Sequence, residues 1–137
     1  STLELVIGQR LVRTLKEDHR VSKTYKQKTL EEQYPKLAPF MNEKEVTLYE
    51  AAEEEDLKNS PFAGRTALFE LIQVSEDLET LAMTSPSAGD IWKIARKEGA
   101  RSMFEDGLEK LKLGRTTPSE LLRVVEPPHH HENKKKK

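Results

Sequence analysis

The sequence predicts an α+β fold with an N-terminal helix, a small antiparallel sheet of two or three strands, and a C-terminal bundle of about four short helices. Strand-forming residues concentrate in two runs, 46–51 (VTLYEA) and 66–72 (TALFELI). From residue 75 onward, apolar residues recur at helical spacing between glycine, proline and serine residues that end helices. With 137 residues, of which 35% are hydrophobic, the chain supports one domain or two small subdomains with a modest core.

Composition argues against several classes of partner and site. The 23 Lys and Arg residues nearly balance the 24 Asp and Glu residues, so net charge gives no reason to expect nucleic acid or membrane as a partner. Cysteine is absent, which excludes disulfides and cysteine-containing zinc sites and suits a reducing compartment. No apolar run reaches the length of a membrane span, and the first residues lack the basic start of a signal peptide. We therefore expect a cytoplasmic protein.

The segment 2–15 is expected to form a helix. Apolar residues form an i, i+4 row along it: Leu3, Ile7, Leu11 and Leu15. So broad an apolar surface is unusual for a terminal helix of a small domain. Either this is a central core helix, or its partners, expected to be a sheet, lie in sequence beyond these residues. The chain also begins at Ser1 without a methionine, which favours a piece cut from a longer protein.

Residues 16–34 are mostly polar and are expected to carry little regular structure. One short edge strand is predicted around 20–25. At 29–34, Thr29 and Glu32 have the spacing of a capping box, although Pro35 and Pro39 limit any helix there.

The best strand in the sequence is 66–72. Alternation places three apolar residues on one of its faces: Ala67, Phe69 and Leu71. Its simplest antiparallel partner is 46–51, reached across the acidic run Glu53–Asp56 and a turn. These two strands are the basis of the predicted sheet.

Four helices are predicted after residue 75. Ser75 is expected to cap the first, which ends at the Ser85-Pro86-Ser87 break. The second is closed by Gly99 and is marked by Ile91, Trp92 and Ala95. Trp92 is expected to lie in the core.

The last two helices form a hairpin within 99–124. The first of them has apolar residues at helical spacing: Met103, Phe104, Gly107, Leu108 and Leu111. Gly114 suits the left-handed conformation that ends a helix. Thr117 can cap the next helix, Pro118 fits its first position, and Glu120 can complete a capping box.

Four segments in this order resemble one family of motor proteins. They are QRLVR at 9–13, FAGRTALFEL at 62–71, Gly99 with Ser102-Met103 and Asp106-Gly107, and GRTT at 114–117 followed by ELLRV at 120–124. Together they resemble the C-terminal region of the type II secretion and type IV pilus assembly ATPases. The resemblance covers about nine tenths of the chain. Members of that family carry a phosphate-binding loop upstream, and no GxxxxGK[ST] occurs here.

The resemblance also implies a lost metal site. Many relatives carry two Cys-x-x-Cys pairs that hold zinc, and their positions are occupied here by Lys16 and His19 and by about Glu54 and Leu57. A structural zinc needs four suitable ligands, and neither lysine nor leucine serves at neutral pH. We therefore expect this region to be held by its sheet and core alone.

On this basis the chain divides into four parts. Residues 1–15 are expected to be the last helix of the nucleotide-binding core, and 16–74 a small sheet subdomain in place of the zinc region. Residues 75–126 are expected to be a C-terminal helical subdomain, and 127–137 a disordered tail.

No residue is predicted to be catalytic or to bind a cofactor or metal. Three arginines, Arg10, Arg13 and Arg65, have two interpretations. They can reach phosphate on a neighbouring subunit, because arginine binds phosphate and carboxylate bidentately. Alternatively, and in our interpretation preferably, they form salt bridges that tie the first segment or the strand to the rest of the core. Glu70 and Asp106 lack the partners that general acid–base catalysis requires.

Four polar segments are interpreted as solvated rather than functional. They are His19, His129–His131, Lys134–Lys137 and Glu53–Asp56. The histidines and acidic residues are not expected to hold a metal, and the lysines are not expected to bind lipid.

The family resemblance implies a specific function. The chain is expected to be the C-terminal fragment of a hexameric ATPase that powers type II secretion or type IV pilus assembly. Its role is then mechanical, through contacts with its own ATPase core, neighbouring subunits and inner-membrane platform proteins. ATP and Mg belong to the parent protein, and the fragment itself is expected to be inactive. The alternative is a stand-alone binding or regulatory module derived from such a motor.

Overall fold

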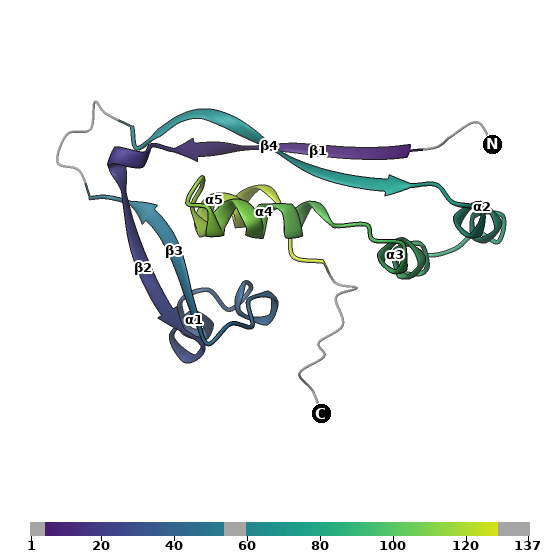
Figure 1. Ribbon diagram of the computed structural model, residues 1–137, viewed down its shortest axis with the longest axis horizontal. Coiled ribbons are helices and arrows are strands. Elements are labelled where there is room, and N and C mark those ends of the chain that lie inside the picture. Colours follow the sequence, from purple (N-terminus) through teal and green to yellow (C-terminus); the bar gives the residue numbers. More distant parts are fainter. Residues whose placement is uncertain (1–4, 54–59, 129–137) are drawn as a thin grey trace.

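A computed structural model describes residues 5–53 and 60–128 and shows the predicted α+β class of fold (Figure 1). Its elements, in chain order, are β1 Leu5–Leu15, the 3₁₀ turn η1 Glu17–His19, β2 Arg20–Lys26, α1 Gln27–Gln33, the 3₁₀ turn η2 Ala38–Phe40, β3 Glu45–Ala51, β4 Phe62–Gln73, α2 Glu76–Ala82, α3 Ala88–Lys97, α4 Met103–Lys112 and α5 Pro118–Val124. The acidic run at Glu53–Asp56 lies largely outside the described residues, and so do 129–137, which hold most of the predicted tail.

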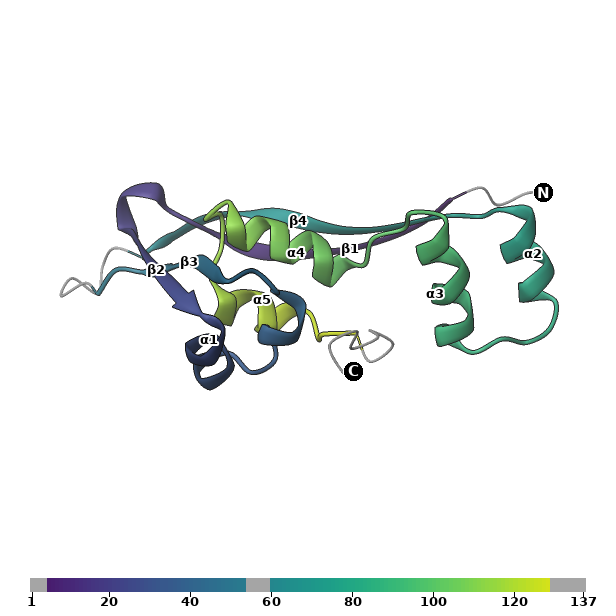
Figure 2. The same cartoon turned by 60° about the horizontal axis from the view of Figure 1, so that its bottom comes forward.

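A long ribbon of two antiparallel strands forms one side of the molecule. β1 and β4 pair along almost their whole length, with Gln9 opposite Phe69 and Arg13 opposite Arg65. The register shifts between Arg13 and Leu15, where β1 has an irregularity typical of a bulge. Helices α4 and α5 lie against one face of this ribbon, and the α2–α3 hairpin lies at its far end (Figure 2).

The predicted helix over residues 2–15 is therefore wrong, because the described part of this segment is strand β1. The i, i+4 row misled because four residues is also twice the two-residue repeat of a strand, so such a row shares one face in either structure. The burial pattern follows the strand repeat. Val12 is fully buried, whereas the neighbouring Leu11 is 45% exposed.

The predicted pairing of 46–51 with 66–72 is also wrong, although both segments are strands. β3 pairs instead with β2, with Tyr25 opposite Val46, so the described residues form two separate two-stranded sheets. The strand predicted around 20–25 is confirmed as β2. Strands β2 and β3, which lie between β1 and β4 in the chain, thus form a hairpin of their own, because β2 is the nearer partner for β3 along the sequence.

The β2–β3 sheet is held by a polar cluster around Glu50. The hydroxyls of Tyr25 and Tyr34 donate to Glu50 Oε1 at 2.8 and 3.0 Å, and Lys23 Nζ lies 3.0 Å from Glu50 Oε2. Burial, followed by the hydrogen bond to Glu50, raises the pKa of Tyr34 to about 12. Both tyrosines therefore stay protonated and keep donating to the carboxylate over the physiological pH range.

Helix α1 begins earlier than predicted and lacks the predicted capping box. It runs over Gln27–Gln33, and its N-cap, Lys26, makes no side-chain capping hydrogen bond. Gln27 instead donates from its side chain to the backbone carbonyls of Met41 and Glu43. The start of α1 is thus fixed by a tertiary contact with the segment before β3.

Serine and threonine caps begin the C-terminal helices, as the sequence predicts for α2 and α5. Ser75 accepts from Leu78 N–H and Thr117 accepts from Glu120 N–H. Ser87 and Ser102 form full capping boxes for α3 and α4. The glycines that end α3 and α4 adopt positive φ angles, +92° at Gly99 and +73° at Gly114. Within the described residues, no helix is long and apolar enough to cross a bilayer.

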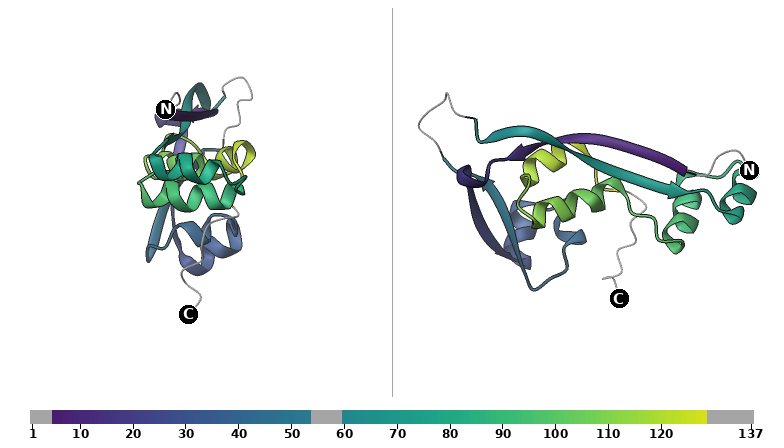
Figure 3. Two further views of the ribbon diagram at one scale, coloured as in Figure 1. Left: turned by 90° about the vertical axis from the view of Figure 1, so that its right-hand side faces the viewer. Right: turned by 45° about the horizontal axis from the view of Figure 1, so that its top comes forward.

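The hydrophobic core lies between the ribbon and the β2–β3 sheet, with α4 and α5 as its central layer (Figure 3). Among the described elements, all four strands and α1, η2, α4 and α5 contribute buried residues to it, with others from the adjoining loops: Val12, Tyr25, Leu30, Leu37, Ala38, Met41, Val46, Leu48, Leu68, Phe104, Leu111, Leu121 and Val125. Trp92, predicted in the core, is half-buried on α3, and the guanidinium of Arg96 lies 5.7 Å from its ring centre. The α2–α3 hairpin is joined to α4 by an ion pair, in which Arg96 Nη2 lies 2.9 Å from Glu105 Oε1.

The crossing of α4 and α5 depends on Gly107. A Cβ atom at Gly107 would lie 2.3 Å from Leu121 Cδ1, and Leu121 is fully buried. We predict that Gly107→Ala lowers the free energy of unfolding by about 1–2 kcal/mol, because overpacking outweighs the better helix propensity of alanine. Urea unfolding measures this. Gly89→Ala on α3, with only Ser87 Oγ at 3.7 Å, is the matched control and is expected to be neutral or stabilising; equal effects of the two would contradict the prediction.

Candidate functional site

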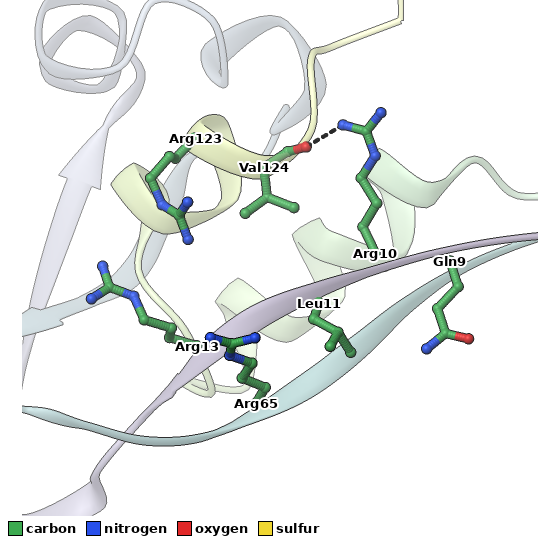
Figure 4. Close-up of a pocket in the computed structure, with 7 residues that line it drawn as sticks. All are labelled: Gln9, Arg10, Leu11, Arg13, Arg65, Arg123 and Val124. Atoms are coloured by element: carbon green, nitrogen blue, oxygen red, sulfur yellow. Dashed lines mark hydrogen bonds between the residues drawn. The ribbon is translucent and has the colours of Figure 1, made fainter.

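An open pocket of about 550 Å³ lies where β1 passes the C-terminal end of α5 (Figure 4). It is lined by Gln9, Arg10, Leu11, Arg13, Arg65, Arg123 and Val124. Four of these seven residues are arginines, and they come from β1, β4 and α5. The three arginines singled out in the sequence are therefore brought together, and Arg123 joins them.

Glu120 fixes two of the arginines. Its side chain is only 1% exposed and accepts three hydrogen bonds from Arg13, from the backbone N–H at 2.8 Å and from Nη2 and Nε at 3.0 and 3.2 Å. Arg123 donates two more, at 2.8 and 3.0 Å. The Arg13 guanidinium also lies 4.3 Å from the ring centre of Phe62. These contacts hold both guanidinium groups at the pocket and join β1 to α5.

The pKa of Glu120 reflects this environment. Burial alone would raise the pKa of this carboxyl, but the hydrogen bonds from Arg123 and Arg13 lower it to about 2. Glu120 is therefore charged at neutral pH. It does not complete the capping box predicted for α5, because its carboxylate oxygens are taken by the two arginines.

Within residues 5–53 and 60–128, no acidic side chain forms an ion pair with either of the other two pocket arginines, Arg10 and Arg65. Arg10 Nη1 donates to the carbonyl of Val124 at 2.5 Å, which is an uncharged partner. Arg65 is exposed, and among the described residues no acid pairs with it. Four arginines therefore line the pocket, and only two of them, Arg13 and Arg123, contact the carboxylate of Glu120, which leaves an excess of positive charge at the pocket. Such a site suits a carboxylate or a phosphate and disfavours a metal cation.

The pocket opens onto an unpaired edge of β1. Arg13 N–H donates to Glu120 and Phe69 N–H donates to Asp106, so these residues form pairs whose backbone groups point out of the β1–β4 ladder. Along a strand, the backbone groups of successive residues point alternately toward and away from the neighbouring strand. Gln9 and Leu11 lie four and two residues from Arg13, so their N–H and C=O groups also point away from β4. Within the described residues nothing bonds to these groups.

The face of the ribbon turned away from α4 and α5 is apolar and uncovered. Leu11 is 45% exposed, Phe69 45% and Leu71 48%. The predicted face of Ala67, Phe69 and Leu71 is thus the outer one, and Leu68 on the opposite face is fully buried. Exposed apolar side chains in one patch mark a surface that another element covers.

Glu70 and Asp106, which are not predicted to be catalytic, join β4 to α4. Asp106 Oδ2 accepts from Phe69 N–H at 2.9 Å, and its Oδ1 lies 3.2 Å from Lys110 Nζ. Glu70 Oε1 accepts from Met103 N–H at 3.3 Å. Each carboxylate thereby accepts a hydrogen bond from a backbone N–H group of the other element.

Two of the four positions that the sequence resemblance aligned with zinc ligands, Lys16 and His19, lie between β1 and β2. His19 Nδ1 lies 2.7 Å from Asp18 Oδ1, and the pKa of Asp18 is lowered by this hydrogen bond. Lys16 donates its backbone N–H to the carbonyl of Pro61 at 2.9 Å. In the part of the chain that the structure describes, no group of three or more His, Cys, Asp or Glu side chains could hold a metal. The other two positions, Glu54 and Leu57, and the segments His129–His131 and Lys134–Lys137 lie outside it.

Sequence reasoning missed Arg123 and the role of Glu120. The spacing of Thr117 and Glu120 indicates a capping box, and this local explanation hid the tertiary partner of the carboxylate. The i, i+3 spacing of Glu120 and Arg123 was the available signal, since such pairs face one another on a helix. Nothing local indicates that Arg13 joins them, because it lies 107 residues away in the chain.

Comparison with known protein families gives one match, to the family described as type II/IV secretion system protein, over residues 1–123. The chain is 33% identical over 126 residues to the type II secretion system protein E of Xanthomonas campestris, which covers 92% of this chain and 22% of the relative. It is 32% identical over 122 residues to the type IV pilus assembly ATPase PilB of Thermus thermophilus, covering 88% of this chain and 13% of the relative. The chain thus spans about a fifth or less of the length of these relatives.

The carboxylate that bridges Arg13 and Arg123 provides a stability test. We predict that Glu120→Gln lowers the free energy of unfolding at pH 7 by about 2 kcal/mol, because it leaves two guanidinium groups without their anion. The folded-state pKa of Glu120 lies below its ordinary value of 4.5, so this contribution is present above about pH 4.5 and is lost as the pH falls toward 2. The difference between the two proteins should therefore shrink from pH 7 to pH 3.

Urea unfolding at each pH measures both effects. Glu109→Gln is the matched control, because Glu109 pairs with Arg101 at 2.7 Å but both side chains are about half exposed. This substitution should change stability by less than about 1 kcal/mol. A pH-independent difference between wild type and Glu120→Gln would contradict the role assigned to the charge.

Proposed function

The chain belongs to the family of type II/IV secretion system proteins, and we propose that it acts as the C-terminal part of a hexameric ATPase that powers type II secretion or type IV pilus assembly. Relatives named as type II secretion system protein E and as a type IV pilus assembly ATPase support this proposal. The matched region is a minor part of each relative. We assign to it a mechanical and subunit-contact role, without catalysis of its own.

The observation that carries this role is the one-sided ribbon of β1 and β4. One face packs on α4 and α5, whereas the other exposes Leu11, Phe69 and Leu71. At the edge of β4, Asp106 accepts from Phe69 N–H, but at the edge of β1 the backbone groups of Gln9 and Leu11 point outward without partners among the described residues. A further strand and a covering element on this side would complete the sheet. We therefore assign β1 as the joint to the remainder of the ATPase core.

Movement at this joint has a direct route to the C-terminal helices. Arg13 on β1 is bonded to Glu120 on α5, and Thr116 Oγ1 donates to the Arg13 carbonyl at 2.9 Å. Leu15 N–H donates to the carbonyl of Arg115 at 2.8 Å. The end of β1 is thus bonded to the α4–α5 turn and to α5, so displacement of the strand displaces these helices with it.

The sequence supports the absence of independent ATP hydrolysis. It contains no GxxxxGK[ST], whose backbone N–H groups and lysine bind the phosphates of ATP. In our proposal ATP and Mg are bound by the remainder of the parent protein. Its partners are then that core, neighbouring subunits of the hexamer and inner-membrane platform proteins, and its location is cytoplasmic, beside the membrane.

Calorimetry tests the absence of nucleotide binding. We predict that the purified chain of 137 residues shows no heat of binding with ATP and Mg²⁺, because it has no phosphate-binding loop. It should also release no phosphate from ATP. Measurable affinity for ATP in the millimolar range or tighter would contradict the proposal.

The joint is tested by reconstitution in trans. The chain is expected to bind the Xanthomonas relative from which the matched 126 residues have been removed, with co-elution from a sizing column as the measurement. Phe69→Lys should abolish binding, because it places a charge in the apolar outer face. Met83→Lys is the matched control, since Met83 is 87% exposed at the end of α2, away from the ribbon. Equal binding of both variants would rule out the ribbon as the joint.

A further inference from the structure

We infer that the segment that binds at the arginine pocket is an extended, acidic stretch of protein that pairs with the edge of β1 at Gln9 and Leu11 and directs its carboxylates to the pocket arginines. This inference rests on the proposed role of β1 as a joint and adds the chemistry of the partner. No acid among the described residues of this chain pairs with Arg65 or Arg10. A carboxylate supplied by the partner would complement these two guanidinium groups.

The charges of the pocket require more than one carboxylate. Arg13 and Arg123 share the carboxylate of Glu120, yet the Arg13 side chain is still 47% exposed and the Arg123 side chain 60% exposed. Arg65 lies opposite Arg13 in the ladder, so the two like charges are cross-strand neighbours. Such neighbours destabilise one another unless an anion lies between them. A partner carboxylate at Arg65 would relieve this repulsion.

The geometry favours an extended segment. The outward backbone groups of Gln9 and Leu11 offer the donors and acceptors that a paired strand uses, and Gln9, Leu11 and Val124 line the same pocket as the arginines. Side chains of an added strand point alternately to the two faces of the ribbon. Arg10 and Val124 lie on the side of α5, whereas Leu11 and Arg65 lie on the outer side (Figure 4). Two adjacent acidic residues would thus reach both sides.

A phosphate group fits the pocket less well. Phosphate sites commonly use backbone N–H groups of a helix N-terminus or a glycine-rich turn. Here the pocket is reached by the C-terminal end of α5, whose Val124 carbonyl carries partial negative charge, and no glycine lines it. Leu11 and Val124 also present apolar surface, which suits a peptide side chain.

The test uses the whole chain and two synthetic peptides. One is a blocked hexapeptide with two adjacent glutamates flanked by valine and threonine, and the other carries glutamines in their place. Titration followed by amide NMR shifts gives the dissociation constants. The glutamate peptide should bind with shifts at Gln9 and Leu11, and the glutamine peptide at least about tenfold more weakly. Its affinity should fall as NaCl is raised.

Substitution of single arginines identifies the site. Arg65→Gln should weaken the glutamate peptide by about fivefold or more. Arg115→Gln is the matched control, because Arg115 is also exposed but lies outside the pocket, and it should change the affinity less than about twofold. Thermal unfolding is expected to be unchanged for Arg115→Gln and unchanged or slightly raised for Arg65→Gln, because the latter removes the repulsion between Arg65 and Arg13.

Several outcomes would overturn the inference. They are equal binding of the two peptides, no effect of Arg65→Gln, stronger binding of inorganic pyrophosphate than of the glutamate peptide with shifts at the same residues, and Arg65-dependent binding to phosphatidylglycerol vesicles without peptide binding. Failure here is separable from failure of the proposed function. If the truncated relative binds in a Phe69-dependent way but the acidic peptide does not, the joint stands and its acidic chemistry is wrong. If only the peptide binds, the pocket stands and the joint is wrong.

Discussion

The buried carboxylate of Glu120 is the interaction on which the arrangement of this molecule most depends. A charge that is 99% shielded from water is stable only with partners, and here five hydrogen bonds from Arg13 and Arg123 supply them. Because Arg13 lies on β1 and Glu120 on α5, satisfying the charge fixes the last helix against the first strand. The same bonds hold two guanidinium groups at the pocket, so one constraint sets both the packing and the charge of the site.

The ribbon of β1 and β4 has one face buried in the core and one face exposed. Its inner face carries Val12 and Leu68 into the core, while its outer face leaves Leu11 and Phe69 half exposed. On the edge of β4, Asp106 accepts from the outward N–H of Phe69. On the edge of β1, Glu120 accepts from the N–H of Arg13, near the end of the strand. The unbonded stretch of β1 therefore lies next to the arginine pocket. Main-chain pairing and charge recognition coincide at this one place.

The β2–β3 hairpin is stabilised by hydrogen bonds and ion pairs between its side chains. Glu50 gathers Tyr25, Tyr34 and Lys23, which ties α1 to both strands. Arg20 then links this sheet to the helices, because its Nη1 donates to the Gly114 carbonyl at 2.8 Å and its guanidinium lies over the ring of Tyr49. Hydrogen bonds and apolar burial thus connect the hairpin to the rest of the molecule at several points.

The sequence by itself determined the α+β class, the family and the boundaries of the C-terminal helices. Caps such as Ser75 and Thr117 act within three residues of themselves, so their signals are readable without tertiary context. The tertiary structure decided whether the i, i+4 row of the first segment was helix or strand, which strands paired, and where Glu120 directed its charge. These depend on partners such as Arg13, 107 residues from Glu120. No local periodicity encodes contacts between residues so far apart in the chain.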